Sequence, residues 1–241
     1  MTEVNDPGHS LEGEPPELSV IIPVLNDAAA LQRVLSSLQS LCPVDLSLQI
    51  IVVDGGSTDG SAAVAEAVAD QVLCSAPGRA RQLQRGVDQA RAPLLWLLHA
   101  DSGLDSRHLE ALAGLREQLV WGRFDVRLDT DARWARCISW FMNHRSCLTG
   151  ICTGDQGIFV SRSLLGRIGG IPQQALMEDV ELSRRLKRER RPLCLQHPLE
   201  TSARRWRRHG IGRTVLLMWW LRLRYFLGAD PADLHRTYYG S

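Results

Sequence analysis

Gln49-Ile-Ile-Val-Val-Asp-Gly-Gly-Ser-Thr-Asp-Gly60 is the stretch of sequence that decides the fold of this chain. Its first half is a short run rich in β-branched residues, which is typical of a strand buried on both faces. Its second half is a turn of small residues, in which Ser57, Thr58 and Asp59 can cap a helix over 61–69. A buried strand that passes directly into a helix predicts the repeating unit of a parallel sheet.

Strand and helix signals alternate on both sides of this stretch. Apolar runs at 18–23, 71–75 and 94–100 predict three more strands, and helices are expected at 28–41 and from about Gly78. This β-α-β-α-β-α-β order predicts an α/β fold with a mostly parallel sheet, helices on both faces and right-handed crossovers. Ligand-binding loops are then expected at the carboxyl ends of the strands.

The second half of the chain is less regular. A short strand is predicted at 157–161, and helices are predicted at 178–190 and 212–227. Four apolar residues recur at helical spacing, and we interpret them as core packing: Trp134, Ile138, Phe141 and Met142. One domain with an appended basic segment is the expected organisation.

The composition excludes several classes of protein. The 241 residues are 44% hydrophobic and 23% charged, with 28 basic and 27 acidic side chains. A core can therefore form, and a disordered chain, a collagen-like fibre and a globally basic nucleic-acid coat are excluded, so no nucleic-acid partner is expected. No run of 18 apolar residues occurs, which predicts no membrane-spanning helix. Six cysteines without a CxxC pair favour a reduced, cytoplasmic setting.

The charges are unevenly distributed along the chain. Residues 1–17 hold five acids and no basic residue or apolar run, so a flexible acidic tail is expected there rather than a signal peptide. Between Arg184 and Arg224 lie thirteen of the 28 basic residues and only two acids. This clustering predicts an acidic partner, such as a phosphate, a phospholipid surface or an acidic substrate.

Three acids fall where a parallel sheet presents its ligand site. Asp54 ends the second predicted strand, Asp101 follows the fourth, and Asp179 opens a late helix. Each alone is compatible with a cap or a turn, but together they suggest a nucleotide and metal site. The turn that follows Asp54 matches neither the dinucleotide-binding nor the P-loop pattern, which disfavours a dehydrogenase and a P-loop NTPase.

Two motifs, Leu18-Ser-Val-Ile-Ile-Pro-Val-Leu-Asn-Asp27 and Val52-Val-Asp-Gly-Gly-Ser-Thr-Asp-Gly60, resemble the opening of the family 2 glycosyltransferases. The most similar subset is the small group called transferase 2, rSAM/selenodomain-associated. Five further motifs carry the resemblance in order: Gly78-Arg-Ala-Arg-Gln82, Leu98-His-Ala-Asp101, Gly154-Asp-Gln-Gly157, Met177-Glu-Asp-Val-Glu-Leu182 and Thr201-Ser-Ala-Arg-Arg-Trp206.

The resemblance covers the chain from about Leu18 to Tyr238 and implies a GT-A fold. We expect a glycosyltransferase domain at 18–203, with a Rossmann-like nucleotide-binding half at 18–103 and an acceptor-binding half at 104–203. Residues 204–241 are expected to form a basic and apolar helical segment packed on this domain.

The resemblance also implies a donor site for a nucleoside-diphosphate sugar, expected to be UDP-linked. Asp54 would contact the uracil or ribose, and Arg79 would contact a phosphate. Arg204 and Arg205 would bind the leaving diphosphate. The residues implied in donor binding are Pro23, Asn26, Asp27, Asp54, Arg79, Gln82, Asp101, Arg204 and Arg205.

His99-Ala-Asp101 lies at the position of the DxD motif, where carboxylates hold a divalent cation on the donor diphosphate. Mn²⁺ or Mg²⁺ would neutralise the charge that develops on the departing nucleoside diphosphate. His99 replaces the first carboxylate, and an imidazole suits Mn²⁺ better than Mg²⁺. Two interpretations of His99 stay open: a metal ligand beside Asp101, or a side chain that packs at the end of the strand.

Glu178-Asp179 matches the ED motif, which implies an inverting reaction. Asp179 would take the proton of the acceptor hydroxyl as its oxygen attacks the anomeric carbon, with Glu178 in support. The alternative is that both carboxylates only complement a helix N-terminus. Asp155 and Gln156 would either bind sugar hydroxyls or form a turn.

Arg205-Trp206 occupies the last two positions of the QxxRW pattern of processive sugar polymerases, which places Trp206 near the acceptor or sugar. Ser202 stands at the position of the glutamine, and no spanning helix is predicted, so processive synthesis is not expected.

Arginine, tryptophan and leucine are mixed over residues 204–227, a composition that suits an interfacial helix on anionic lipid. A helix that covers the domain or forms a dimer contact is the alternative. The acceptor is therefore left as a small metabolite or a lipid, and the protein is expected in the cytoplasm, with peripheral binding to the inner face of the cell membrane as a hypothesis.

Two other functions were weighed against the glycosyltransferase. A sugar-nucleotide pyrophosphorylase shares this kind of sheet, but Pro23-Val-Leu-Asn-Asp27 stands where its glycine-rich signature is expected. A non-catalytic membrane-surface or partner-binding protein of the same fold is favoured only by His99 and the basic segment.

Overall fold

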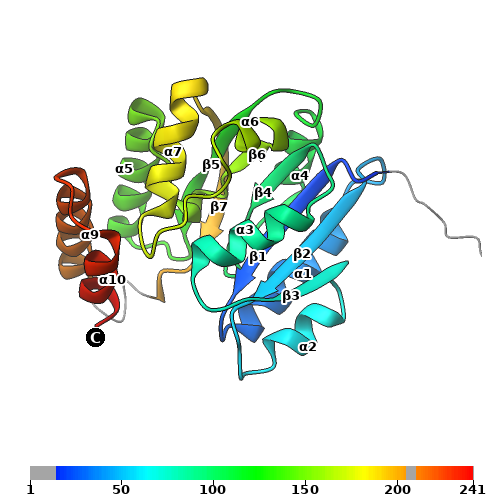
Figure 1. Cartoon of the computed structure of the whole chain (residues 1–241), viewed down its shortest axis with the longest axis horizontal. Helices are drawn as coiled ribbons and strands as arrows, with labels where there is room; N and C mark the ends of the chain where they lie inside the picture. Colours follow the sequence, from blue (N-terminus) through cyan, green and yellow to red (C-terminus); the bar gives the residue numbers. More distant parts are fainter. Residues whose placement is uncertain (1–14, 205–209, 241) are drawn as a thin grey trace, which may run out of the picture.

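A seven-stranded sheet in the order β3-β2-β1-β4-β6-β5-β7 runs through the molecule (Figure 1). The structure is a computed structural model and describes residues 15–204 and 210–240. The strands are β1 Leu18–Val24, β2 Leu48–Asp54, β3 Gln71–Cys74, β4 Leu94–Leu97, β5 Trp121–Leu128, β6 Phe159–Ser161 and β7 Leu193–Thr201.

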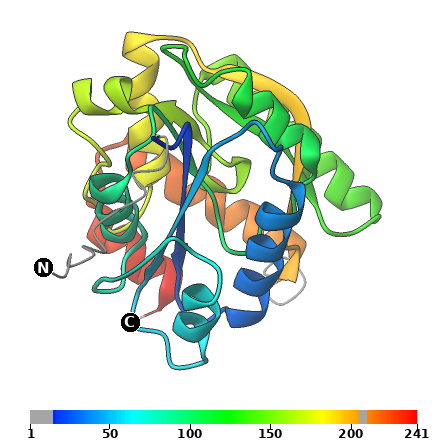
Figure 2. The ribbon, with the colours of Figure 1, turned by 90° about the vertical axis from the view of Figure 1, so that its right-hand side faces the viewer.

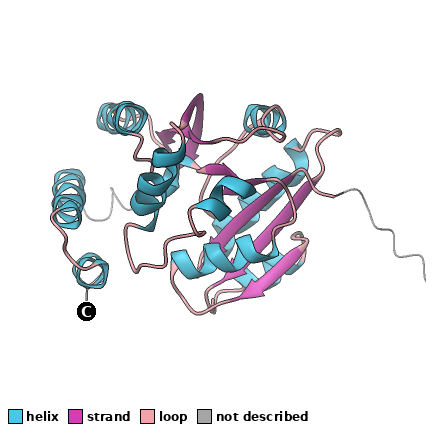
Figure 3. Cartoon of the chain, turned by 45° about the horizontal axis from the view of Figure 1, so that its top comes forward, coloured by secondary structure: helices cyan, strands magenta, loops and turns pink. Residues whose placement is uncertain are grey.

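Helices cover both faces of this sheet (Figure 3). They are α1 Ala28–Leu41, α2 Ser61–Glu66, α3 Arg79–Gln89, α4 Ser106–Ala113, α5 Arg133–Thr149, α6 Arg162–Arg167, α7 Glu178–Glu189, α9 Ile211–Phe226 and α10 Pro231–Tyr239, with one 3-10 turn, η1, at Gly154–Gln156. In the side view of Figure 2, α1 and α3 lie on opposite sides of β1.

The first half of the sheet is parallel, as the sequence predicts. β1 pairs in parallel with both β2 and β4, so that Val20 lies opposite Ile50 on one side and Trp96 on the other. β2 pairs in parallel with β3. The α/β class is confirmed, and the carboxyl ends of β1, β2 and β4 meet at one edge of the sheet.

The second half of the sheet is mixed. β6 runs antiparallel to both β4 and β5, whereas β5 and β7 are parallel. Neither β5 nor β7 is predicted by the sequence patterns. In β5, Arg123 and Asp125 interrupt the apolar pattern, and β7 carries Pro198 on the outer strand of the sheet, where a missing N–H is tolerated.

The two faces of the sheet bury separate cores, because successive side chains of a strand point to opposite faces. One core packs α1, α2 and α4 on Val20, Ile22 and their neighbours. The other packs α3, α6 and α7 on Ile21 and its neighbours. Strands β1, β2 and β4 thus contribute to both cores, which explains why they are mostly apolar.

The apolar residues of α5 only partly fulfil the prediction of core packing. Trp134 and Ile138 pack on a small cluster with Leu128. Phe141 is 41% exposed, so the prediction was wrong for this residue. Its ring lies 5.7 Å from that of Trp219 on α9, which places it in a contact between helices at the surface.

Helices α9 and α10 lie beside α5 and α7 at one end of the molecule (Figure 1). A third apolar cluster fastens them there: Leu221 and Leu234 pack with Ile151, Met177 and Val180. Helices α9 and α10, from the C-terminal end of the chain, therefore pack against the N-terminus of α7 and hold it in place. Within the described ranges, no helix is long and apolar enough to cross a membrane.

Candidate active site

The loops after β1 and β2 are bonded to each other at the carboxyl edge of the sheet. The carboxylate of Asp54 accepts the N–H groups of Gly56 (3.1 Å) and Ser57 (3.0 Å), which closes the turn. Asn26 has a φ of 52°, a conformation that asparagine tolerates. Its Oδ1 accepts the N–H of Thr58 at 2.8 Å, and its own N–H donates to the Ser57 hydroxyl at 2.9 Å. The two loops therefore form one unit.

Gln82 lies beneath these loops and is 4% exposed. Its Nε2 donates to the carbonyls of Val24 and Val53, each at 2.9 Å, and so joins the ends of β1 and β2. Pro23 lies in β1 opposite Val53. Gln82 thus lies in the region expected for the donor site, but its amide nitrogen already donates to two backbone carbonyls.

Arg204, although distant in sequence, also lies at the carboxyl edge of the sheet. Its Nη2 lies 2.9 Å from Oδ2 of Asp27, which is 177 residues away along the chain. The hydrogen bond and charge of Asp27 raise the pKa of Arg204, and the charge of Asp101 adds to this effect. Arg204, Asp27 and Asp101 are therefore neighbours, as a diphosphate site would require. Arg205 and Trp206 lie outside the described residues.

Asp101 also lines a groove of about 470 Å³ on the side of α1. The groove lies between α1, the loop that follows β4 and the ends of β5 and β7. Arg33 and Arg127 line it together with Asp101, so both signs of charge face the same space.

A second group of polar side chains meets around Gly154, at the start of η1. Nδ1 of His99 lies 3.2 Å from Oδ1 of Asp155, and Nε of Arg79 lies 3.3 Å from Oε1 of Glu178. A Cβ at Gly154 would lie 2.5 Å from Nε2 of His99 and 2.8 Å from Nη1 of Arg79. Glycine is needed here because both side chains approach the backbone closely.

Asp179 is fixed at the N-terminus of α7 by two backbone groups. Its Oδ2 accepts the N–H of Gly154 at 2.9 Å, and its Oδ1 accepts the N–H of Val180 at 2.8 Å. Met177, just before the helix, has a φ of 64°, which is uncommon for a residue with a long side chain. Arg79, His99, Glu178 and Asp179 line one pocket together.

Burial and neighbouring charges shift the pKa values of Glu178 and Arg79. Glu178 is 6% exposed, and burial raises the pKa of its carboxyl, while the charge of Arg79 opposes the rise and that of Asp179 adds to it. Burial alone would lower the pKa of Arg79, but the charges of Glu178, Asp179 and Asp155 outweigh it and raise that pKa. The Arg79 guanidinium is thus held charged among three carboxylates.

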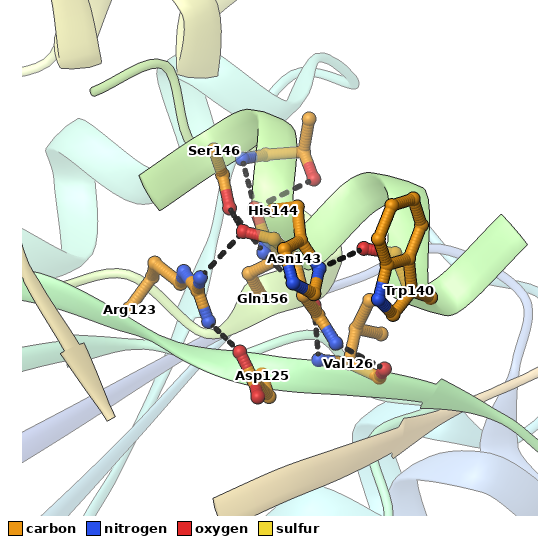
Figure 4. A network of polar contacts seen from close by, with 9 residues as sticks. Arg123, Asp125, Val126, Trp140, Asn143, His144, Ser146 and Gln156 are labelled. Carbon is orange, nitrogen blue, oxygen red and sulfur yellow. Dashed lines mark hydrogen bonds and ion pairs between the residues drawn. The ribbon is translucent and has the colours of Figure 1, made fainter. Parts of the chain in front are cut away.

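Gln156, which follows Asp155, points into the protein and is fully buried (Figure 4). Its Oε1 accepts the N–H of Thr153 at 3.2 Å, and its Nε2 donates to the Ser146 hydroxyl at 2.9 Å. Asn143 belongs to the same network and bonds both backbone groups of Val126. The structure therefore brings Asp155 to the site but not Gln156, whose amide supports the loop.

The site offers few donor atoms to a metal ion. Among the residues that the structure describes, no three His, Cys, Asp or Glu side chains are grouped so as to hold a metal ion. His99 turns Nδ1 towards Asp155 and Nε2 towards Gly154. Asp101 remains as one carboxylate, which fits Mg²⁺ or Mn²⁺ when substrate phosphates supply further ligands.

Two arginines near Asp179 were missed from the sequence. Arg145 lies on α5 and Arg222 on α9, and the charge of Asp179 acts on the pKa of each. Neither belongs to a recognisable motif. No sequence signal points to them, because only the packing of α9 against α5 and α7 brings them together.

The chain has a mixed sheet of this order, with carboxylates at the ends of β2 and β4 and at the start of α7. This is the fold of the GT-A glycosyltransferases. The chain belongs to glycosyl transferase family 2, whose model matches residues 19–163. The narrower subset stays a prediction.

Curated relatives in Mycobacterium bovis and Mycobacterium tuberculosis are named PGL/p-HBAD biosynthesis glycosyltransferases. They are 32% identical over an alignment of 167 residues that covers 64% of this chain and 62% of theirs. The chain thus spans less than two thirds of the length of these relatives.

Solved structures share the fold at lower identity. A mannosyltransferase from Pyrobaculum calidifontis in complex with GDP-Man and Mn²⁺ has a TM-score of 0.58 and 19% identity, over 78% of this chain and 57% of that one. Glucosyl-3-phosphoglycerate synthase from Mycobacterium tuberculosis in complex with UDP has a TM-score of 0.57 and 21% identity, over 77% and 71%.

Proposed function

We propose that this protein transfers a sugar from a nucleoside-diphosphate sugar, expected to be UDP-linked, to a hydroxyl group of an acceptor, with inversion at the anomeric carbon. The observation that carries the proposal is Asp179, which two backbone N–H groups hold beside Glu178, Arg79 and His99. Family membership favours this transfer over the pyrophosphorylase reaction.

In the proposed reaction the acceptor oxygen attacks the anomeric carbon while the bond from that carbon to the diphosphate breaks. The proton of the hydroxyl passes to the carboxylate of Asp179, and the nucleoside diphosphate leaves with the bonding electrons. A general base of this kind contributes about 10²–10⁴-fold to the rate. Backbone bonds orient Asp179, so its position does not depend on the donor.

The donor is proposed to lie over the joined loops of β1 and β2, with its diphosphate between Asp101 and Arg204. Asp101 would hold Mn²⁺ or Mg²⁺ together with phosphate oxygens. When bound, the cation supplies charge neutralisation for the leaving diphosphate. Arg204 is proposed as the second positive charge at the diphosphate. Its Nη2 lies 2.9 Å from Oδ2 of Asp27, which orients the guanidinium.

Donor binding is tested by the thermal unfolding of the full chain with UDP, GDP or dTDP and their sugars, with and without Mn²⁺. We expect one nucleotide to raise the melting temperature, and Mn²⁺ to increase the rise. A ligand at a hundredfold excess over its Kd stabilises the folded state by about 2.7 kcal/mol.

Two variants with the same change of charge sharpen this experiment. Asp101→Asn should lose the Mn²⁺-dependent part of the rise, whereas Asp45→Asn changes an exposed loop residue and should keep it. If properly folded wild-type protein shows no rise with any nucleotide, the non-catalytic alternative gains support.

A membrane surface is proposed as a second partner, because large apolar side chains are exposed on α9 and on the adjoining part of α5. The exposed fractions are 55% for Trp219, 46% for Trp220 and 59% for Trp140. Arg224 lies over the Trp220 ring at 4.9 Å. Tryptophan with arginine on one surface fits the boundary of an anionic bilayer, which would place the protein on the inner face of the cell membrane.

Sedimentation with vesicles tests this partner. We expect binding to vesicles of phosphatidylglycerol, weaker binding to phosphatidylcholine, and loss of binding in the double variant Trp219→Ala/Trp220→Ala. Trp134→Phe, which changes a half-buried tryptophan on α5, is the control. Equal sedimentation of the wild type and the double variant would exclude this surface.

A further inference from the structure

Two arginines close to the proposed base have guanidinium nitrogens without partners. Nε and Nη2 of Arg145 are buried and have no hydrogen-bond partner in the described part of the chain, and the same holds for Nε of Arg222. Nη1 of Arg145 donates to the carbonyl of Ile151 at 3.3 Å. Leaving a buried charged donor unsatisfied costs more than leaving a neutral donor unsatisfied.

The charge of Arg222 acts on Arg145. Burial first, and the charge of Arg222 second, lower the pKa of Arg145 to about 10. Burial lowers the pKa of Arg222 as well, although the charges of Asp179 and Asp155 oppose this effect. Two like charges that share a partly buried space favour a bound anion.

The carboxylates nearby are already engaged with other groups. Asp179 accepts two backbone N–H groups, and Asp155 lies against His99. Glu178 pairs with Arg79. The unpartnered guanidinium nitrogens donate to none of these acids, although the charge of Asp179 acts on the pKa of both arginines and that of Asp155 acts on the pKa of Arg222.

Position separates this pair from the proposed diphosphate site. Arg204, which follows β7, bonds Asp27 after the end of β1, whereas Arg145 and Arg222 come from α5 and α9, on the side of α7 (Figure 1). An anion held by Arg145 and Arg222 would lie next to the group that takes the acceptor proton.

We infer that Arg145 and Arg222 form an anion subsite for the acceptor, which therefore carries a phosphate or carboxylate as well as the hydroxyl that is glycosylated. The inference rests on the proposed function and adds the chemical class of its acceptor. The anion orients the acceptor so that its hydroxyl faces Asp179, and Arg222 makes α9 part of the site.

The test uses three small hydroxyl compounds with the full chain: glycerol 3-phosphate, glycerate and uncharged glycerol. Each is titrated in a thermal-unfolding experiment with the nucleotide that stabilises the protein already present. We expect the two anions to raise the melting temperature further in a saturable way, and glycerol to have no effect. No effect of either anion, together with no stabilisation by phosphatidylglycerol vesicles, would overturn the inference.

Matched variants assign the effect to these residues. Arg145→Gln and Arg222→Gln should each weaken anion binding at least about tenfold, because each removes a charge-assisted hydrogen bond, and both should keep the nucleotide effect. Arg136→Gln on α5 and Arg213→Gln on α9 remove exposed arginines from the same helices and should bind anions as the wild type does. Unchanged anion binding in both test variants would contradict the assignment.

Further outcomes distinguish the possible sources of the anion, and they distinguish failure of the inference from failure of the proposed function. Stabilisation by phosphatidylglycerol vesicles, but not by glycerol 3-phosphate, would assign the anion to a lipid headgroup if Arg145→Gln abolishes it. Competition between the anion and the nucleotide would place the arginines at the donor diphosphate and overturn the inference. Anion binding without any nucleotide binding would refute the proposed function instead. If the glutamine variants do not fold, the contrast between glycerol 3-phosphate and glycerol in the wild type decides.

Discussion

Gly154 shows at the scale of one residue how tightly the site is built. Its N–H donates to Asp179, and the space for a side chain is filled by His99 and Arg79. We expect Gly154→Ala to destabilise the protein by about 1–3 kcal/mol, since overpacking of this kind forces its neighbours to move. Transfer activity should fall as well, because the Asp179 contact shifts with the loop.

Gly166→Ala is the control for that change. Gly166 lies in α6 with nothing within 4 Å of its added Cβ, so alanine should stabilise the protein by up to about 1 kcal/mol. Urea unfolding measures both variants. An equal response of the two glycines would contradict the close approach at Gly154.

Where a motif marks the end of a strand or the start of a helix, the structure brings the residues predicted from the sequence together, and their roles stay predictions. Glu178 and Arg79 were both predicted, although their ion pair at 3.3 Å was not. Gln156 belongs to the same motif as Asp155 but turns inward, because successive side chains of a 3-10 turn such as η1 point about 120° apart. A motif indicates which residues matter and not which way each one points.

At the scale of elements, α9 is a structural part of the domain and also presents an apolar surface. Leu221 is fully buried against Met177 and Leu234, whereas Leu223 on the same helix is 58% exposed. Leu221→Ala should cost about 2–5 kcal/mol of unfolding free energy, and Leu223→Ala less than about 0.5 kcal/mol. Chemical denaturation distinguishes them, and a similar cost for both would show that α9 does not pack as described.

Helix α4 should make the stability depend on pH through His108. Its ring is 1% exposed, its Nδ1 accepts the N–H of Asp105 at 3.0 Å, and burial lowers its pKa from the ordinary 6.5. Between the lowered pKa and 6.5 the unfolded chain binds a proton that the folded chain does not. Stability is therefore lost as the pH falls below 6.5, by at most about 1.4 kcal/mol per pH unit.

Unfolding in urea at about pH 7.5 and about pH 5.5 measures this loss. The decrease should be smaller in His108→Gln than in the wild type. His144→Gln, which changes an exposed histidine on α5, should keep the wild-type decrease. A decrease of the same size in all three proteins would show that His108 does not carry it.

At the scale of the whole molecule, the parallel half of the sheet could be predicted because β1, β2 and β4 are buried on both faces and are therefore mostly apolar. In the mixed half β6 was predicted but β5 was not, because β5 holds charged residues that are paired only in the fold, such as Arg123 with Asp125. The Arg145–Arg222 pair was equally hidden, since it depends on how α9 packs. Local sequence patterns report burial, and these features depend on long-range contacts.

The central claim, that Asp179 is the base of a sugar transfer, is tested most directly by the release of nucleoside diphosphate from the sugar nucleotide that binds, with glycerol 3-phosphate and water as the hydroxyl compounds that can take the sugar. We predict release by the wild type and a rate at least about a hundredfold lower in Asp179→Asn, with nucleotide binding unchanged. Asp88→Asn, which alters an exposed residue of α3, should release at the wild-type rate. Equal rates in the wild type and Asp179→Asn, or binding without any release, would contradict the account.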